Sequence, residues 1–302
     1  MKHCIMANIN SNIILVKCNA NRIDNFWIHA WNNHKCYTRL HYALDQTPTD
    51  SGYYKILIKP GQYMLGCNVF KINCNIEISG VHDFNMPIIT TNTQFNQFHI
   101  SCNISISNLV FNDINLGFNT PIPKMEQTYV NISNCIFGSG STLKIQRINR
   151  ATISNCKFNT GYIILGEKRY YIYENVKDDN LPKINYDIIN NNFTDTKFGC
   201  IIFRGKQRNA STINITDNVV SNCGLLCNIS MERASIYFTN NIFTNMVSCV
   251  DSYNESAFIT FKSNTFTNVN KLYHYGNGED VIKLDTSNEF TDCGIDLTKY
   301  AI

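Results

Sequence analysis

The chain has 302 residues, of which 16% are charged, and its formal net charge at neutral pH is +3. This length can bury a large core, either as one elongated domain or as two compact ones. The basic residues are scattered along the chain, which argues against a nucleic-acid-binding protein. Asparagine is unusually frequent, with 44 copies, but its clusters are interleaved with Ile, Phe, Val and Tyr, so we expect the chain to fold throughout.

The first twenty residues, "MKHCIMANINSNIILVKCNA", hold no apolar run of signal length followed by a cleavage site. No later stretch approaches the roughly 18 apolar residues that a membrane span requires. We therefore expect a protein that is not secreted by a signal peptide and has no membrane span, located in the cytoplasm or in a particle assembled inside the cell. Its 13 cysteines are then expected to be reduced thiols. No CxxC pair occurs, and Cys223 and Cys227 have no histidine nearby, so we expect no metal site and no cofactor.

Residues 1–37 form a lead segment that differs from the rest of the chain. Within it, "NIILVKC" predicts a strand, and "FWIHAW" contains both tryptophans, Trp27 and Trp31. These rings either pack over the end of the domain that follows or form a docking patch for a protein partner. The next stretch, "CYTRLHYALDQ", is the best helix candidate and is expected to cover the N-terminal opening of that domain.

A repeated phrase occupies most of the remaining sequence. Each copy is an alternating strand, a polar corner and a second short strand, as in "TINITDNVV", "SIYFTNNIF" and "FITFKSNTF". The last apolar residue of each copy is Phe111, Phe137, Phe158, Phe193, Val220, Phe243, Phe266 and Phe290. A unit of about 23 residues with three short strands describes one coil of a parallel β-helix. We predict an all-β right-handed parallel β-helix of about nine to ten coils over residues 38–302.

The corner of each repeat shows two columns of polar residues. Three positions before the anchor stand Asn108, Asn134, Asn155, Asn190, Asp217, Asn240, Ser263 and Ser287, residue types that turn corners through local hydrogen bonds. Two positions before it stand Leu109, Cys135 and Cys156, then Asn191, Asn218, Asn241, Asn264 and Asn288. Coils stack about 4.8 Å apart, so the five successive asparagines predict an amide ladder along the axis.

The stretch "HYALDQTPTDSGYYKILIKPGQYML", followed by "VFKINCNIEISG", resembles the opening of the pectin-lyase-like right-handed β-helix superfamily. The features in common are a short amphipathic capping helix, a strand, a "PGxY" turn and an "I-x-I-x-G" rung, and the resemblance covers roughly residues 38–300. It implies the fold. It leaves the function open, because the same architecture hosts lyases, hydrolases, phage and virus spikes, and inert scaffolds.

The resemblance implies a first candidate site along an outer strand face, where the enzymes of this superfamily bind substrate. Eight residues beyond three successive anchors stand Asn228, Asp251 and His274, and Arg204 belongs to the preceding coil. We expect these four side chains to form one column, in which Asp251 beside His274 could act in general acid/base catalysis. The alternative is that they are polar only because they face water.

A second candidate is "GNGEDVIKL", in which Glu279 and Asp280 lead into a strand. It is similar to the "G-D-D-x-I" element of polygalacturonases, whose paired carboxylates cleave glycosidic bonds. The companion motifs "NTD", "GHG" and "RIK" are missing, and "RGKQR" at 204–208 lacks the Arg-x-Pro-x-x-Arg spacing of pectate lyases. A solvated turn is the simpler interpretation.

The interval between Phe158 and Phe193 is 35 residues long and predicts a protruding loop at about 165–187. The loop concentrates Lys168, Arg169, Tyr170, Tyr171 and Tyr173, a composition common in recognition surfaces. A hairpin that packs its tyrosines on neighbouring coils is the alternative.

Two function classes remain. The first is a non-enzymatic structural or attachment protein, as in viral or phage-like particles, that presents loops to a protein or glycan partner. Self-association is also expected at the C-terminal coil, since a coil without a cover exposes unpaired strand edges. The second is a carbohydrate-active lyase or hydrolase. The missing catalytic motifs and sparse charge favour the first.

Overall fold

The structure is a computed structural model of the whole chain. It describes residues 13–16, 35–37, 40–45, 53–65, 69–81, 85–91, 96–121, 128–166, 183–197, 199–205, 211–231, 234–252, 257–274 and 281–299. No helix among these residues is long and apolar enough to cross a membrane.

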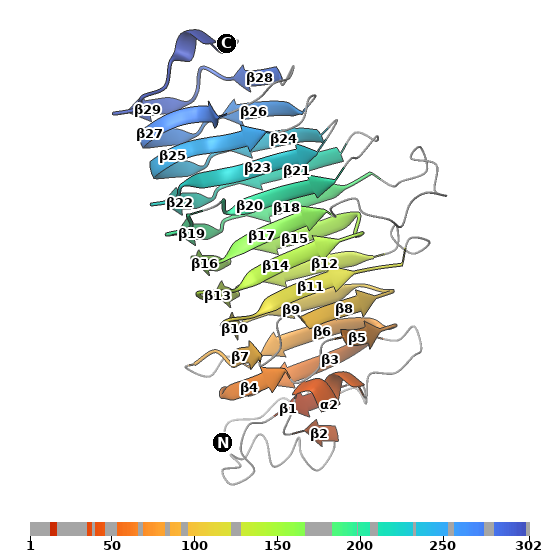
Figure 1. Cartoon of the computed structure of the whole chain (residues 1–302). Coiled ribbons are helices and arrows are strands. Elements are labelled where there is room, and N and C mark those ends of the chain that lie inside the picture. The colour runs from red at the N-terminus through yellow and green to blue at the C-terminus, as the bar shows by residue number, and fades with distance from the viewer. Residues whose placement is uncertain are drawn as a thin grey trace, which may run out of the picture.

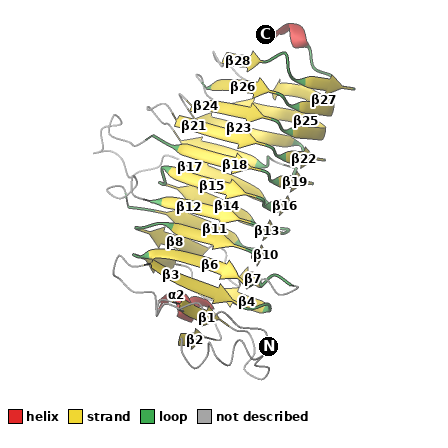
Figure 2. Ribbon diagram, turned by 180° about the vertical axis from the view of Figure 1, so that it is seen from behind, coloured by secondary structure: helices red, strands yellow, loops and turns green. Residues whose placement is uncertain are grey.

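The described chain winds into a right-handed parallel β-helix, with strands stacked along an axis that runs from the N-terminal to the C-terminal end (Figure 1). The prediction of a β-helix is confirmed. Two parallel sheets run along the rod, and Figure 2 shows the same stack from behind.

The first sheet has twelve strands. In spatial order they are β2 (Lys35–Tyr37), β1 (Ile13–Val16), β3 (Tyr53–Ile58), β6 (Asn75–Gly80), β9 (Ile104–Ser107), β12 (Tyr129–Ser133), β15 (Arg150–Ser154), β18 (Asn185–Ile189), β21 (Ser211–Thr216), β24 (Ala234–Thr239), β26 (Phe258–Lys262) and β28 (Val281–Leu284). The ten strands from β3 to β28 follow one another along the axis, and the solenoid has about eight turns, slightly fewer than the nine to ten predicted.

The second sheet has seventeen strands, short and long in alternation along the chain. They are β4 (Gln62–Leu65), β5 (Val69–Ile72), β7 (Ile88–Thr91), β8 (Asn96–Ile100), β10 (Val110–Phe111), β11 (Asn115–Asn119), β13 (Ile136–Phe137), β14 (Thr142–Gln146), β16 (Lys157–Asn159), β17 (Tyr162–Gly166), β19 (Asn192–Thr194), β20 (Ile201–Gly205), β22 (Val219–Ser221), β23 (Leu225–Met231), β25 (Ile242–Ser252), β27 (Thr265–His274) and β29 (Glu289–Thr291). In β25 and β27 the short and long strands have merged into one.

The N-terminal end is covered by a short helix, α2 (Leu40–Asp45), as the sequence predicts. Its Leu40, Ala43 and Leu44 are buried, and the helix contacts β1, β2, β4 and β5. The strand predicted in the lead segment is β1, which pairs in parallel with β3 and so extends the first sheet. At the other end, the described residues finish in a 3-10 helix, η3 (Leu297–Lys299).

The anchor residues identified in the sequence pair with one another in register from coil to coil. Their rings stack inside the rod: the Phe137 and Phe158 centroids are 4.7 Å apart with the planes 3° from parallel, and Phe158 lies 4.8 Å from Phe193. Stacked rings in a dry core add aromatic contact to the burial of large apolar surface. The column continues toward the N-terminus, where Phe111 pairs with Ile89 and Ile89 with Tyr63.

The predicted amide ladder is present in the core. The side-chain Nδ2 of each asparagine donates to Oδ1 of the next, at 3.0 Å in all four steps from Asn191 to Asn288. Each Oδ1 also accepts the backbone N–H of the preceding asparagine, for example 2.9 Å from Asn218 N to Asn241 Oδ1. The second amide hydrogen binds a carbonyl of the preceding coil, as in Asn241 Nδ2 to Ile215 O at 2.8 Å.

Cys135 and Cys156 occupy the same column, and their thiols form hydrogen bonds with backbone carbonyls. The Cys156 thiol lies 3.2 Å from Ser154 O and 3.8 Å from Ile132 O, the two kinds of carbonyl that an asparagine amide reaches in later coils. Burial raises the pKa of Cys135, so its sulfur is a neutral thiol. The described cysteines are all free thiols.

Candidate functional site

Nine of the residues selected from the sequence lie outside the described part of the chain. They are Trp27, Trp31, Lys168, Arg169, Tyr170, Tyr171, Tyr173, Glu279 and Asp280. The predicted loop joins β17 to β18, and the described chain stops at Gly166 and resumes at Lys183. The roles of these residues, and the domain boundary at residue 37, stay predictions.

The candidate catalytic column lies on the outward side of the long strands of the second sheet. Asn228 on β23 pairs with Asp251 on β25, which in turn pairs with His274 on β27. These three positions are therefore in register on successive coils, as the spacing predicts. Arg204 is offset from them by two residues, because it pairs with Ser230, and the position beside Asn228 is taken by Ile202.

Asp251 is unusual for an outward-facing carboxylate because only 8% of its surface is exposed. Its Oδ1 has no hydrogen-bond partner within the part of the chain that the structure describes. An isolated buried carboxylate oxygen is costly, which makes this atom a position where a ligand or a proton could be bound. No group of three or more His, Cys, Asp or Glu side chains among the described residues could hold a metal ion.

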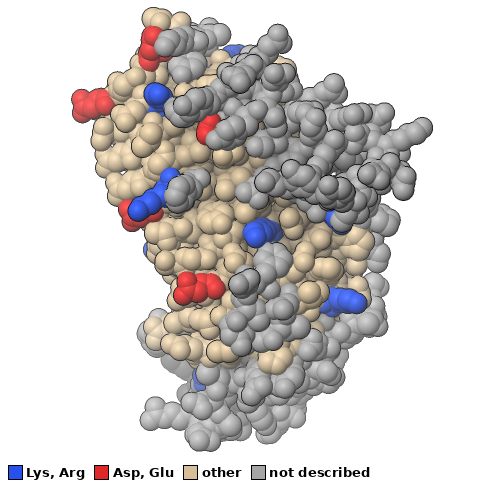
Figure 3. Space-filling model, in the orientation of Figure 1, with Lys and Arg blue, Asp and Glu red and all other residues tan. Residues whose placement is uncertain are grey.

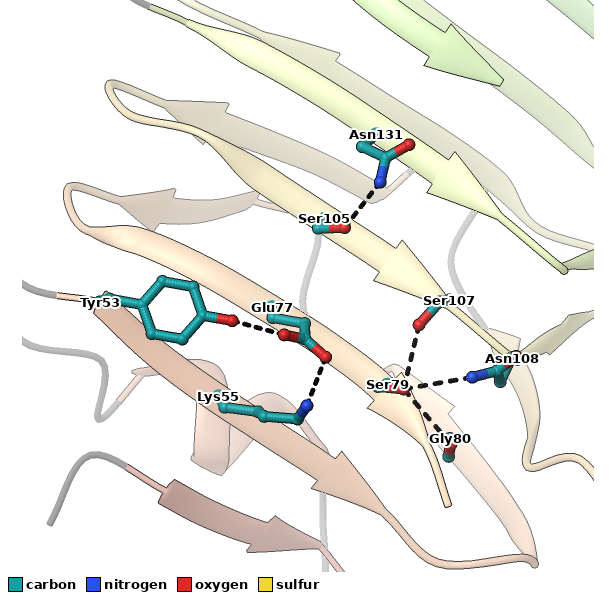
Figure 4. Close-up of polar contacts among 9 residues, drawn as sticks. All are labelled: Tyr53, Lys55, Glu77, Ser79, Gly80, Ser105, Ser107, Asn108 and Asn131. Carbon is teal, nitrogen blue, oxygen red and sulfur yellow. Dashed lines mark hydrogen bonds and ion pairs between the residues drawn. The ribbon is translucent and has the colours of Figure 1, made fainter. Parts of the chain in front are cut away.

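The outer face of the first sheet carries a second, larger set of polar side chains. Figure 4 shows its N-terminal part, where Lys55 Nζ lies 2.6 Å from Glu77 Oε1 and the Tyr53 hydroxyl donates to the other oxygen of Glu77. Farther along, Asn131 Nδ2 donates to Ser105 Oγ at 3.0 Å (Figure 4). In this region the outward polar groups satisfy one another.

The ionisable groups of this network shift in the directions their contacts require. Desolvation, together with the hydrogen bond to Glu77, raises the pKa of Tyr53 to about 12. For Glu77, partial burial favours the neutral acid, but the hydrogen bonds from Lys55 and Tyr53 outweigh it and lower the pKa. Over a wide range of pH, Glu77 is therefore a charged carboxylate and Tyr53 is a neutral phenol.

The C-terminal part of the same face is built differently. Two aromatic rings, Tyr237 on β24 and Phe258 on β26, are 41% and 54% exposed. Residue pairing places Ser235 beside Phe258 and Thr260 beside Tyr237, so the two rings are diagonal neighbours on adjacent coils. We call the outer face of β21, β24 and β26 around these rings the aromatic face.

Charge is sparse on the described surface in view in Figure 3, where a few Lys, Arg, Asp and Glu side chains lie among uncharged residues. At the C-terminal rim of the aromatic face lie Lys262 and Lys283, with Asp285 close by. Hydrogen bonds from Ser287 and, to a smaller extent, these two ammonium groups lower the pKa of Asp285.

We did not identify from the sequence a second corner of the coil, at which the chain turns from the anchor residue into the long strand of the second sheet. Two residues after the anchor the backbone is left-handed at Asp113, Thr160, Asp195, Asn222, Asn245, Asn268 and Asp292, with φ between 51° and 58°, and Gly140 has φ 72° at the corresponding turn. Asn and Asp tolerate this conformation better than other residues do, so the column of Asn and Asp two places beyond each anchor was a usable signal.

Comparison with known proteins gives little beyond the architecture. No protein-family model matches the chain, and no curated protein matches it. Among solved structures, tailspike protein 3 of bacteriophage CBA120 is similar, with 10% sequence identity and a TM-score of 0.33. The match covers 80% of this chain and 53% of that one, so the chain spans about half the length of the tailspike. A similarity of this extent concerns the solenoid and says nothing about ligand or activity.

Proposed function

We propose that this protein is a non-enzymatic attachment or structural protein, a rigid β-helical rod that recognises a partner through its sides, as a component of a viral or phage-like particle would. The observation that carries this proposal is the internal amide ladder from Asn191 to Asn288 with its flanking phenylalanine stacks. Each rung is tied to the next by side-chain and main-chain bonds. Such a core resists bending and can present side loops at fixed positions.

The loop between β17 and β18 is the first recognition element to test. Deleting residues 168–182 leaves three connecting residues, the same number that joins β14 to β15. We expect the shortened protein to keep the thermal unfolding midpoint of the parent within a few degrees and to lose partner binding. A matched control replaces residues 122–127, between β11 and β12, by a Gly/Ser linker, and should bind as the parent does. Unchanged binding after the first deletion would reject the loop as the recognition element.

A carbohydrate-active enzyme is the second candidate, and one observation favours it. Asp251 is buried, its Oδ1 has no hydrogen-bond partner among the described residues, and it stands in register between Asn228 and His274. A carboxylate in that state could take up a proton from a substrate hydroxyl or hydrogen-bond to a sugar.

The two candidates are separated by a product assay. The protein is incubated with polysaccharides of several classes, and reducing ends and unsaturated products are measured. The attachment function predicts retention of a polysaccharide without product. Product formation that disappears in Asp251→Asn, with an unchanged unfolding midpoint, would instead establish the enzyme.

A further inference from the structure

The aromatic face differs from the rest of the first sheet in how its polar groups are used. Toward the N-terminus, hydroxyls and charges bond to one another: Ser107 Oγ, for example, donates to Ser79 Oγ at 3.0 Å, and Lys55 pairs with Glu77. The outward hydroxyls of β21, β24 and β26 include those of Thr212, Ser235 and Thr260, which form no hydrogen bond with the residues that the structure describes. Their bonding capacity is available to a ligand.

Aromatic rings are exposed at the same place. Tyr237 and Phe258 are the large outward side chains of two adjacent strands, and neither is held by a polar contact as Tyr53 is. Diagonal neighbours in a sheet have their Cβ atoms about 7–8 Å apart, so the two rings can contact one ligand together. Exposure of the Phe258 ring to water does not stabilise the fold. Ser235 lies beside this ring and Thr260 follows it on the same strand, so hydrogen-bonding groups surround its apolar surface.

The chemistry of this arrangement matches an uncharged sugar. A pyranose presents apolar C–H faces that lie against aromatic rings, while its hydroxyls exchange hydrogen bonds with hydroxyl and amide groups at the edge. The Asn214 amide is a further polar group on this face. Its Nδ2 donates to Asp187 at 2.8 Å, and this bond fixes the orientation of its carbonyl oxygen. Charged side chains border the two rings: Lys283 pairs with Thr260, and Asp187 binds Asn214. Ser235, Tyr237 and Phe258 have only uncharged cross-strand partners, so the centre of the face is uncharged.

We propose that the aromatic face binds an uncharged oligosaccharide, with Tyr237 and Phe258 contacting the sugar rings and the hydroxyls of Ser235 and Thr260 bonding to the sugar hydroxyls. This inference rests on the attachment function proposed above and adds a glycan ligand on a second surface, separate from the partner expected at the loop between β17 and β18. It places recognition on the flank of the first sheet, away from the outward column of Asn228 and Asp251 on the second. The regular rise of the coils allows successive sugars to lie along the rod axis.

The test begins with the full chain on an array of neutral and acidic oligosaccharides, followed by calorimetric titration with the best neutral ligand. We expect Tyr237→Ala combined with Phe258→Ala to weaken binding at least roughly ten-fold, because a few buried aromatic contacts carry most of the affinity in such sites. The matched control is Val219→Ala combined with Ile242→Ala, a pair of apolar side chains 38% and 46% exposed on adjacent strands of the other sheet. That control should bind as the parent does.

Each other outcome overturns the inference in a distinguishable way. Binding that needs acidic glycans and fades with salt points to a charged ligand. Neutral binding that survives in the Tyr237 and Phe258 variant but is lost when residues 168–182 are deleted moves recognition to the loop and leaves the attachment function standing. Absence of any glycan binding rejects the sugar while leaving a protein partner to the loop-deletion test. Turnover of the bound glycan would instead reject the attachment function and leave the binding face in place.

Discussion

Replacing Asn241 by alanine tests the amide ladder at its centre. The change removes four hydrogen bonds: two that Asn241 Nδ2 donates, to Asn264 Oδ1 at 3.0 Å and Ile215 O at 2.8 Å, and two that its Oδ1 accepts from Asn218, at 2.9 and 3.0 Å. Each is worth about 1 kcal/mol net, and the partners left behind are buried with no water to replace the lost group. We therefore expect a loss of about 3–5 kcal/mol in the free energy of unfolding.

The control is Asn245→Ala, at the second corner of the same coil. Asn245 also forms a ladder, with Asn222 at 3.1 Å and Asn268 at 2.9 Å, but these amides are exposed and water can replace them. Its cost comes mainly from alanine at φ 54°, about 1–2 kcal/mol. Equilibrium denaturation in guanidinium, with circular dichroism and fluorescence recorded together, measures both. If Asn241→Ala costs no more than Asn245→Ala, the internal ladder does not stabilise the rod as argued here.

Three further predictions follow from the same contacts. Cys156→Asn should be neutral or stabilising by about 1 kcal/mol in denaturant titration, because Asn191 Oδ1 already accepts the Cys156 backbone N–H and can accept a second bond from the new amide; a loss above 2 kcal/mol would contradict this. Phe158→Ala, which empties a fully buried position between two stacked rings, should cost about 3–5 kcal/mol, against less than 1 kcal/mol for the exposed Val247→Ala. The pKa of Glu77 is lowered in the folded state, so the stability that Glu77 contributes is present above the ordinary carboxyl pKa and is lost as pH falls through the pKa of the folded state. The pKa of Tyr53 is raised, so the stability that Tyr53 contributes is complete below about pH 10 and is lost as pH rises toward 12. Unfolding midpoints of Glu77→Gln should therefore vary less with acid pH than those of the parent, and those of Tyr53→Phe less with alkaline pH.

The repeat could be predicted from the sequence because its signals are local. A buried anchor such as Phe158 must recur once per coil, and a left-handed corner favours Asn or Asp. The positions of these residues in the sequence therefore give the register between successive coils. The predicted contacts between Asn191 and Asn288 are present for this reason. The direction in which the amides donate, from each coil to the next toward the C-terminus, was not predictable, since an asparagine side chain can be turned either way.

The column that contains Cys135 and Cys156 shows a second limit of sequence reasoning. The residue type alone indicates a small apolar group, but the Cys156 thiol points at carbonyls equivalent to those that amide hydrogens reach in later coils. A thiol can donate one weak bond and cannot accept the backbone N–H as an amide oxygen does. The coils that carry cysteine in this column therefore have weaker hydrogen bonds there than the coils that carry asparagine. The difference in polarity between the two sets of coils is smaller than the residue types imply.

The candidate site was less predictable than the fold. Periodic spacing placed Asn228, Asp251 and His274 in one register. Arg204 is two residues out of step, since it pairs with Ser230 while Ile202 pairs with Asn228. The burial of Asp251 depends on the surroundings of its strand and has no local signature. Tyr237 and Phe258 belong to successive repeats, and the pairing of β24 with β26 makes them diagonal neighbours, as the register of the repeat requires.

One titration tests whether the rod binds a sugar without catalysing a reaction on it. The full chain is mixed in the calorimeter with the neutral oligosaccharide that it retains on the array, and the recovered sugar is then analysed for cleavage. We predict saturable binding that is lost in the Tyr237 and Phe258 variant, with the oligosaccharide recovered intact. Recovery of a shortened or unsaturated sugar, or saturable binding that the variant leaves unchanged, would contradict this prediction.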